Sequence, residues 1–146
     1  VTLSGRFDRI DTLSGGGLAI VDYKTGKAPS PKAVAAGYSL QLGLIGAIAE
    51  AGGFAGIAGR AGAFEYWSLA KNRDAFGSIS DPTGPVEKGR IPADGFVANA
   101  RKEFEAEAGK YLTGNDPFTA KLHPEYAPYG DYDQLMRLDE WYGRER

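Results

Sequence analysis

Two short segments near the start of the chain carry the residue types that metal-assisted chemistry needs. Residues 5–11 (G-R-F-D-R-I-D) include Asp8, and residues 21–26 (V-D-Y-K-T-G) include Asp22 and Lys24. Two carboxylates held close together repel each other, so that one takes up a proton unless a cation lies between them. Mg²⁺ prefers oxygen ligands and typically binds one or two protein carboxylates together with phosphate and water. The segments therefore predict a Mg²⁺ site, which could also take Mn²⁺, facing a substrate phosphate.

The chemistry that such a site could perform is hydrolysis of a phosphodiester. A bound divalent ion can polarise the phosphodiester and lower the pKa of a bound water. Lys24, beside the ion, could orient that water and offset the negative charge that develops in the transition state. The backbone carbonyl of Tyr23 is a further oxygen ligand in this hypothesis, next to Asp8 and Asp22.

A β-hairpin would bring the two segments together. Residues 1–11 alternate well enough for a strand, a serine and three glycines then provide a turn, and residues 18–25 read as the returning strand. The period of two places Asp22 and Lys24 on one face. The turn brings Asp8 level with Asp22, to within one residue of register. Directly paired positions lie about 5 Å apart between Cβ atoms, so the hairpin predicts one shared patch.

A further signal is Gln41, which lies on a helix expected over residues 38–51. Its helical neighbours at i+3, i+4 and i+7 are apolar: Leu44, Ile45 and Ile48. An amide that faces a core needs hydrogen-bond partners. Since the nearest polar cluster is the carboxylate site, we expect Gln41 to bind metal-bound water or a phosphate.

Each of these features also has an ordinary structural explanation. A D-x-K sequence on a strand is usually a solvated surface or an ion pair. Asp8 with Arg9 and Asp11 could form a salt-bridge set of a hairpin, and Gln41 could be partly exposed. Their combination with a matching turn length favours the catalytic interpretation.

The remainder of the chain predicts elements that would support the hairpin. We expect a third strand over residues 63–69, a polar loop over 72–92, an amphipathic helix over 96–112, an irregular stretch over 115–130 and a short helix over 131–141. This order predicts an α/β or α+β domain around a mixed sheet.

Length, composition and charge limit the class of protein. A chain of 146 residues has the size of one domain. It has no cysteine, which excludes disulfides, cysteine-bound zinc and an iron–sulfur cluster and fits a cytoplasmic location. No apolar run reaches membrane-spanning length. The net charge of -2 argues against a broad basic surface but not against local carboxylates that bind a metal.

The motifs resemble those of the PD-(D/E)XK nuclease superfamily, in its RecB-like branch. Residues 5–11 look like the G-x-x-D strand of that branch, residues 22–26 look like its D-Y-K-[ST]-G motif, and Gln41 falls at the glutamine of its Q-x-x-x-Y motif. The tail, residues 129–141, is similar to that of AddB proteins. The resemblance is therefore closest to the C-terminal nuclease domain of the AddB family, subunits of AddAB helicase–nucleases that process double-strand breaks for recombination.

The resemblance implies a fold and a site. The fold is a restriction-endonuclease-like mixed central sheet flanked by helices, in a single nuclease domain over residues 1–146. The catalytic set is Asp8, Asp22, Lys24 and Gln41, and the metal ligands are Asp8, Asp22 and Tyr23. The implied activity is Mg²⁺-dependent hydrolysis of DNA of the exonuclease type. The implied partners are DNA and an AddA-like helicase–nuclease subunit, with no membrane.

Two departures from the family pattern leave alternatives open. Ile45 stands where the family often has tyrosine. The chain also begins at Val1, without the upstream helix of the family or an initiator methionine, so we expect a fragment of a larger protein that is weakly active or inactive by itself. The alternatives are a stand-alone RecB-like exonuclease and a catalytically inactive DNA-binding or scaffolding module.

Overall fold

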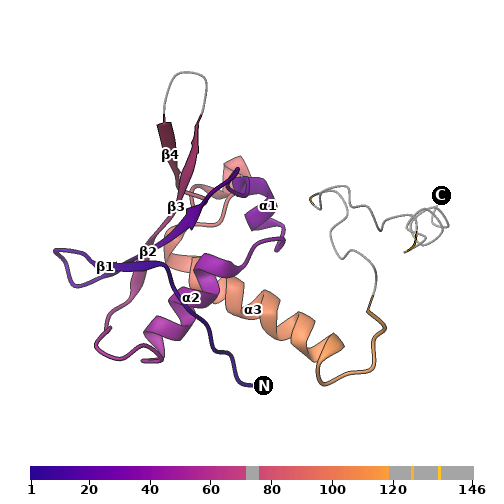
Figure 1. The fold of residues 1–146 in the computed structure, drawn as a ribbon. Helices are drawn as coiled ribbons and strands as arrows, with labels where there is room; N and C mark the ends of the chain where they lie inside the picture. Colours follow the sequence, from indigo (N-terminus) through magenta and orange to yellow (C-terminus); the bar gives the residue numbers. More distant parts are fainter. Residues whose placement is uncertain (72–75, 119–125, 127–134, 136–146) are drawn as a thin grey trace.

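The computed structural model describes residues 1–71, 76–118, 126 and 135, in which two strands, two helices, two further strands and a long final helix follow one another (Figure 1). The elements in chain order are β1 (Arg9–Thr12), β2 (Leu18–Lys24), α1 (Pro31–Ala35), α2 (Gln41–Glu50), β3 (Ala61–Lys71), β4 (Phe76–Ser80), a 3-10 helix (Val86–Lys88) and α3 (Ala93–Tyr111). The helix expected over residues 131–141 lies outside the described residues.

The strands form one mixed sheet of four strands in the order β1-β2-β3-β4. β1 and β2 are antiparallel, β2 and β3 are parallel, and β3 and β4 are antiparallel. A parallel pair needs a crossover connection, and α1 and α2 lie in the one that joins β2 to β3. The predicted mixed sheet flanked by helices is confirmed, and it is consistent with a restriction-endonuclease-like fold.

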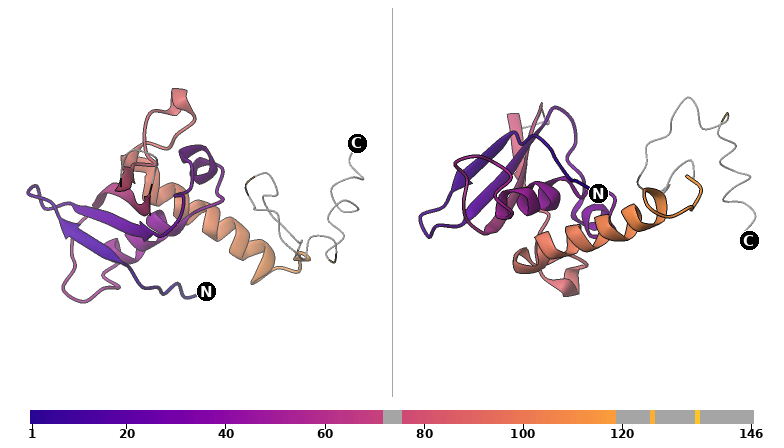
Figure 2. Two further views of the ribbon diagram at one scale, coloured as in Figure 1. Left: turned by 45° about the horizontal axis from the view of Figure 1, so that its top comes forward. Right: turned by 90° about the horizontal axis from the view of Figure 1, so that it is seen from below.

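Helices α2 and α3 pack against one face of the sheet and against each other (Figure 2). Their contact depends on two glycines of α2. A Cβ atom at Gly43 would clash with the Ala100 side chain, and one at Gly46 would lie 2.9 Å from Cγ2 of Val97. Because these positions lack side chains, α2 can approach α3 closely. The two helices together cover Phe64, which is fully buried.

The hairpin of β1 and β2 forms with the register that the sequence predicted. Arg9 pairs with Val21, which brings Asp8 level with Asp22. Its turn uses Gly16 at a φ of 81°, a conformation that glycine adopts without steric cost. The first strand is nevertheless much shorter than the predicted residues 1–11. Residues 1–8 form no strand, and Gly5 instead lies beside Ile45 and Ile48 of α2. The Phe7 ring packs edge-on against Phe54, which follows α2, with centroids 4.7 Å apart.

Three other elements differ from the sequence expectation. β4 lies within the region predicted as a polar loop, residues 72–92, and that prediction was wrong for these five residues. Ile79 and Phe76 of β4 are 63% and 80% exposed, so the segment carries no buried face that a sequence pattern could reveal. The helix expected over residues 38–51 begins only at Gln41, and α3 begins three residues before the expected 96.

The buried stripe of α2 also differs from the predicted one. Leu42, Ile45 and Ala49 are buried, whereas Leu44 and Ile48 are only partly buried. The prediction was wrong for Leu44 and Ile48 because α2 packs between the sheet and α3, so that its core-facing side turns toward Leu42. It was also wrong for Gln41, which is exposed and does not face the core.

The opposite face of the sheet carries exposed aromatic and apolar side chains. Tyr23 and Trp67 lie edge to face there, with ring centroids 5.8 Å apart, and the Arg9 guanidinium lies 5.0 Å from the Trp67 ring centroid. Leu69 follows Trp67 on this face and is 48% exposed. In the described ranges, no helix is long and apolar enough to cross a membrane.

Candidate active site

Asp22 and Lys24 lie at the carboxyl end of β2, on the face that the helices cover. Their face follows from the alternation along the strand, since Ile20 on the same face is buried in the core. Asp22 is only 5% exposed. Tyr23 points to the opposite face, so that only its backbone belongs to the site.

The side chain of Gln41 joins Asp22 and Lys24 into a closed triangle. Gln41 Nε2 donates to Asp22 Oδ1 at 2.6 Å, and Lys24 Nζ donates to Gln41 Oε1 at 2.9 Å. Lys24 Nζ also lies 2.8 Å from Asp22 Oδ2. An amide can donate only through nitrogen and accept only through oxygen. The Asp22 carboxylate and the Lys24 ammonium together therefore fix the orientation of the Gln41 amide. Gln41 therefore lies in the site that the sequence predicted, at the first residue of α2.

Asp8 lies immediately before β1. Continuing the register of Arg9 with Val21 by one step places Asp8 opposite Asp22. The Tyr23 backbone N–H donates to Asp8 Oδ2 at 2.9 Å. This hydrogen bond explains why β1 begins only after Asp8. The Tyr23 N–H bonds to the Asp8 carboxylate and so is not available to extend the backbone pairing of β1 with β2. The Asp8 carboxylate is thus held against the backbone of Tyr23, the residue between Asp22 and Lys24.

One oxygen of Asp22 provides a test of whether the site fits a cation. Among the residues that the structure describes, no aligned hydrogen-bond donor reaches the buried Asp22 Oδ2, and the close cation is the Lys24 ammonium. The ammonium at 2.8 Å compensates the charge of this oxygen, but its angle does not meet that of a hydrogen bond. A hard divalent cation would complete its coordination, and Asp8, at the register position opposite Asp22, would be the second carboxylate.

The donor set consists of two carboxylates, a number that Mg²⁺ accepts. In the part of the chain that the structure describes, no group of three or more His, Cys, Asp or Glu side chains could hold a metal ion. Mg²⁺ commonly binds through one or two carboxylates and keeps waters and substrate phosphate as its remaining ligands. The two aspartates therefore fit this ion.

Strand β3 adds two hydroxyl side chains that the sequence analysis missed. In the parallel ladder, Tyr66 pairs with Asp22 and Ser68 pairs with Lys24. Ser68 Oγ donates to the Gly26 carbonyl at 2.8 Å and so holds the turn that follows Lys24. The sequence of β3 could have indicated them. Its core-facing positions change from Phe64 to Tyr66 at the same level at which those of β2 change from Ile20 to Asp22.

Tyr66 contacts the site from the neighbouring strand β3. It is completely buried, its ring centroid lies 5.6 Å from Lys24 Nζ, and its hydroxyl lies 3.2 Å from Ser39 Oγ. Burial raises the pKa of the Tyr66 hydroxyl above its ordinary value, the Ser39 hydrogen bond opposes that change, and the Asp22 charge adds to it. Tyr66 therefore stays protonated and neutral beside Asp22.

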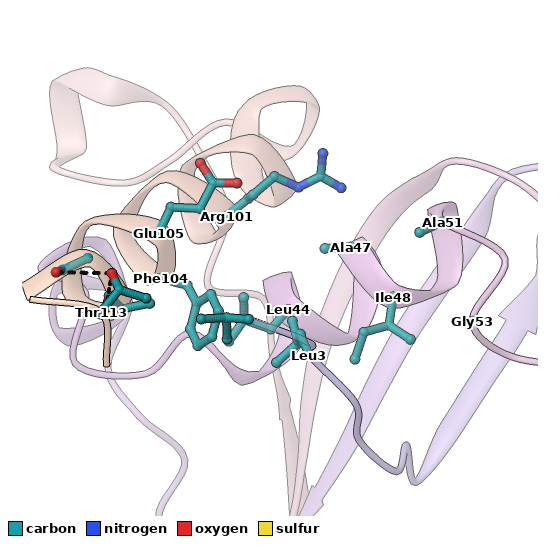
Figure 3. Close-up of a pocket in the computed structure, with 13 residues that line it drawn as sticks. Leu3, Leu44, Ala47, Ile48, Ala51, Gly53, Arg101, Phe104, Glu105 and Thr113 are labelled. Carbon is teal, nitrogen blue, oxygen red and sulfur yellow. Dashed lines mark hydrogen bonds between the residues drawn. The ribbon is translucent and has the colours of Figure 1, made fainter. Parts of the chain in front are cut away.

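A cavity of about 490 Å³ lies away from these residues, between the N-terminal segment, α2 and α3 (Figure 3). Its walls are mostly apolar, with Leu3, Leu44 and Phe104 side by side, and Arg101 and Glu105 are its charged residues. It contains none of the four predicted catalytic residues. The predicted catalytic residues lie instead at the end of β2, where Asp22, Lys24 and Gln41 are in contact.

The fold and the site together define a class of protein, a nuclease domain with acidic residues and a lysine at the end of a central strand. Residues 1–129 match the family model of the PD-(D/E)XK nuclease superfamily, and the chain belongs to that superfamily. The members of this superfamily are nucleases that hydrolyse phosphodiesters. No curated protein and no solved structure matches the chain significantly.

Proposed function

We propose that this domain is a metal-dependent deoxyribonuclease whose site consists of Asp8, Asp22, Lys24 and Gln41. The observation that carries the proposal is the closed triangle of Asp22, Gln41 and Lys24 around a buried carboxylate oxygen that lacks an aligned hydrogen bond. A mere surface ion pair would not bury its carboxylate beside a second, facing aspartate.

Each residue has a distinct role in this proposal. Asp8 and Asp22 would hold Mg²⁺ or Mn²⁺, and the Tyr23 carbonyl would be a further oxygen ligand. When bound, the ion supplies Lewis-acid polarisation of the phosphodiester and a water of lowered pKa. Lys24 directs N–H donors at the attacking water and the phosphate oxygens, where negative charge develops. Gln41 keeps the ammonium and the Asp22 carboxylate at fixed positions, which limits the reorganisation needed during the reaction.

The biological setting belongs to the same proposal. Similarity of the tail, residues 129–141, to AddB proteins supports a subunit of a cytoplasmic helicase–nuclease that processes double-strand breaks with an AddA-like partner. The net charge of -2 supports it as well. Nonspecific DNA affinity comes mainly from basic residues that neutralise phosphates, so another part of the protein or a partner subunit would provide the basic track. The absence of cysteine excludes an iron–sulfur cluster held by this chain.

Cleavage of end-labelled linear DNA tests the proposal. The intact protein should cleave it with Mg²⁺ and not with EDTA, and Asp22→Asn should reduce the rate to background while thermal unfolding stays cooperative. Glu87→Gln, an exposed carboxylate of the 3-10 helix, is the matched control and should retain full activity.

Two results would contradict the proposal. Equal cleavage by wild type and Asp22→Asn would show that another site performs the chemistry. Binding of DNA without any Mg²⁺-dependent or Mn²⁺-dependent cleavage would favour the inactive DNA-binding module. Activity that needs no partner subunit would leave the nuclease assignment intact and favour a stand-alone exonuclease.

A further inference from the structure

The start of α2, which carries Gln41, lacks a local cap. Its N-cap residue is Leu40, whose side chain makes no capping hydrogen bond. The usual capping residues, such as serine, fix a helix start by accepting a hydrogen bond from a backbone N–H of its first turn. The position of Gln41 must therefore be stabilised in another way.

Ser39 provides a tertiary tether at this point of the chain. It lies in the connection between α1 and α2, two residues before Gln41, and its Oγ is 3.2 Å from the Tyr66 hydroxyl. Tyr66 is on β3, directly beside Asp22. The hydrogen bond thus connects the helix start that carries Gln41 to the strand that borders the metal-binding carboxylate.

The ring of Tyr66 makes a second contact with the site. Its centroid lies 5.6 Å from Lys24 Nζ, within the range of a cation–π interaction. Since the tyrosine is completely buried, it cannot touch a DNA strand. A buried hydroxyl is unfavourable unless it is hydrogen-bonded, and Phe64, two positions earlier on the same face, has none. The hydroxyl at position 66 therefore needs an explanation beyond packing.

We propose that Tyr66 is a positioning residue of the nuclease site, whose ring supports Lys24 and whose hydroxyl, through Ser39, holds Gln41 in place. This inference rests on the proposed function. The two roles are separable, because phenylalanine keeps the ring and loses only the tether. Leucine loses both.

Kinetic measurements on the intact protein test the inference. Tyr66→Phe and Ser39→Ala should each lower kcat for Mg²⁺-dependent DNA cleavage by about 10-fold, the lower end of the effect of losing an outer-shell partner of a metal ligand, because both act through Gln41. The KM for DNA should change less than about twofold, because the tyrosine does not touch the substrate. The double variant should be no slower than either single variant, since both remove the same bond. Tyr66→Leu should be slower than Tyr66→Phe. Tyr111→Phe, at the end of α3, is the matched control and should match wild type.

A spectroscopic readout separates this inference from the proposed function. The Gln41 side-chain amide, identified by its loss in Gln41→Ala, should shift or broaden in ¹H–¹⁵N spectra of Tyr66→Phe and Ser39→Ala, but not of Tyr111→Phe. An unchanged Gln41 signal or additive effects of the two substitutions on kcat would overturn the positioning role. If wild type does not cleave DNA at all, the proposed function fails, and the Gln41 signal alone then decides whether Tyr66 positions this residue.

Discussion

Replacing Lys24 by methionine removes the ammonium and keeps an unbranched side chain of similar length. In the structure this ammonium lies 2.8 Å from Asp22 Oδ2, the oxygen that we assign to the divalent ion. The lysine and the metal therefore bind the same carboxylate. Lys24→Met should strongly slow cleavage but strengthen binding of the ion, because it removes a positive charge from beside the ion.

The magnitude follows from distances and Coulomb's law. Mg²⁺–oxygen contacts are about 2.0–2.1 Å, so an ion on the same oxygen would lie no more than about 5 Å from the ammonium. Even at the dielectric constant of water, a single and a double charge at that distance repel by about 1.7 kcal/mol. Since about 1.4 kcal/mol is a tenfold change in a dissociation constant, the variant should bind Mg²⁺ or Mn²⁺ at least about tenfold more tightly. Its cleavage rate should fall by about 10²–10³.

Folding without the ion gives a further check. Removal of one partner from a fully buried ion pair costs about 3–5 kcal/mol. The Lys24 side chain is 29% exposed, which weakens the pair. We therefore expect a loss on the order of 1 kcal/mol without metal, and the added ion should restore it.

Three measurements on the same preparation test this prediction: Mn²⁺ titration, DNA cleavage, and urea unfolding with and without the ion. Lys88→Met, an exposed lysine of the 3-10 helix, is the control for the change in net charge. Ion binding by Lys24→Met that is equal to or weaker than that of wild type would refute the reasoning, because it would show that the ammonium and the ion do not share Asp22.

Three further predictions concern the ligands and the helix packing. Asp8→Asn and Asp22→Asn should each weaken Mn²⁺ binding and stop cleavage, measured by titration and by gel assay; a metal-bound structure with the two carboxylates more than about 8 Å apart would contradict a shared ion that has contacts of about 2.1 Å. Gln41→Ala should lower kcat by about 10- to 100-fold while the protein stays folded, and an unchanged kcat would remove the amide from the mechanism. Gly46→Ala should destabilise the protein by about 1–3 kcal/mol in urea unfolding, since the new methyl group would lie 2.9 Å from Val97; Gly95→Ala, with no atom within 4 Å, should be neutral or stabilising and serves as its control.

The sequence by itself determined the hairpin and the residues that it aligns. Alternation with a period of two and the length of a short turn are local properties, and they place Asp8 opposite Asp22 and put Lys24 on the same face as Asp22. The Asp22–Lys24 motif and the glutamine of α2 also sufficed to indicate the family. These inferences needed no knowledge of what packs against the hairpin.

Only the tertiary structure decided where the first strand begins and which loop residues become a strand. Val1 to Asp8 alternate in sequence, but the Asp8 carboxylate bonds to the Tyr23 N–H and the preceding residues pack on α2. The exposed residues of β4 form a strand because the edge of β3 offers backbone partners. Neither partner is encoded in the local pattern.

Tertiary structure also decided the surroundings of the catalytic residues. The sequence predicted that Gln41 faces a core and therefore needs polar partners, whereas the residue is exposed, and the crossover between β2 and β3 determines that it contacts Asp22 and Lys24 together. The same crossover brings Ser39 to Tyr66, which is 27 residues away in the chain. Hydrogen bonds between residues so far apart depend on how parallel strands and helices pack, and no periodicity of the sequence specifies that packing.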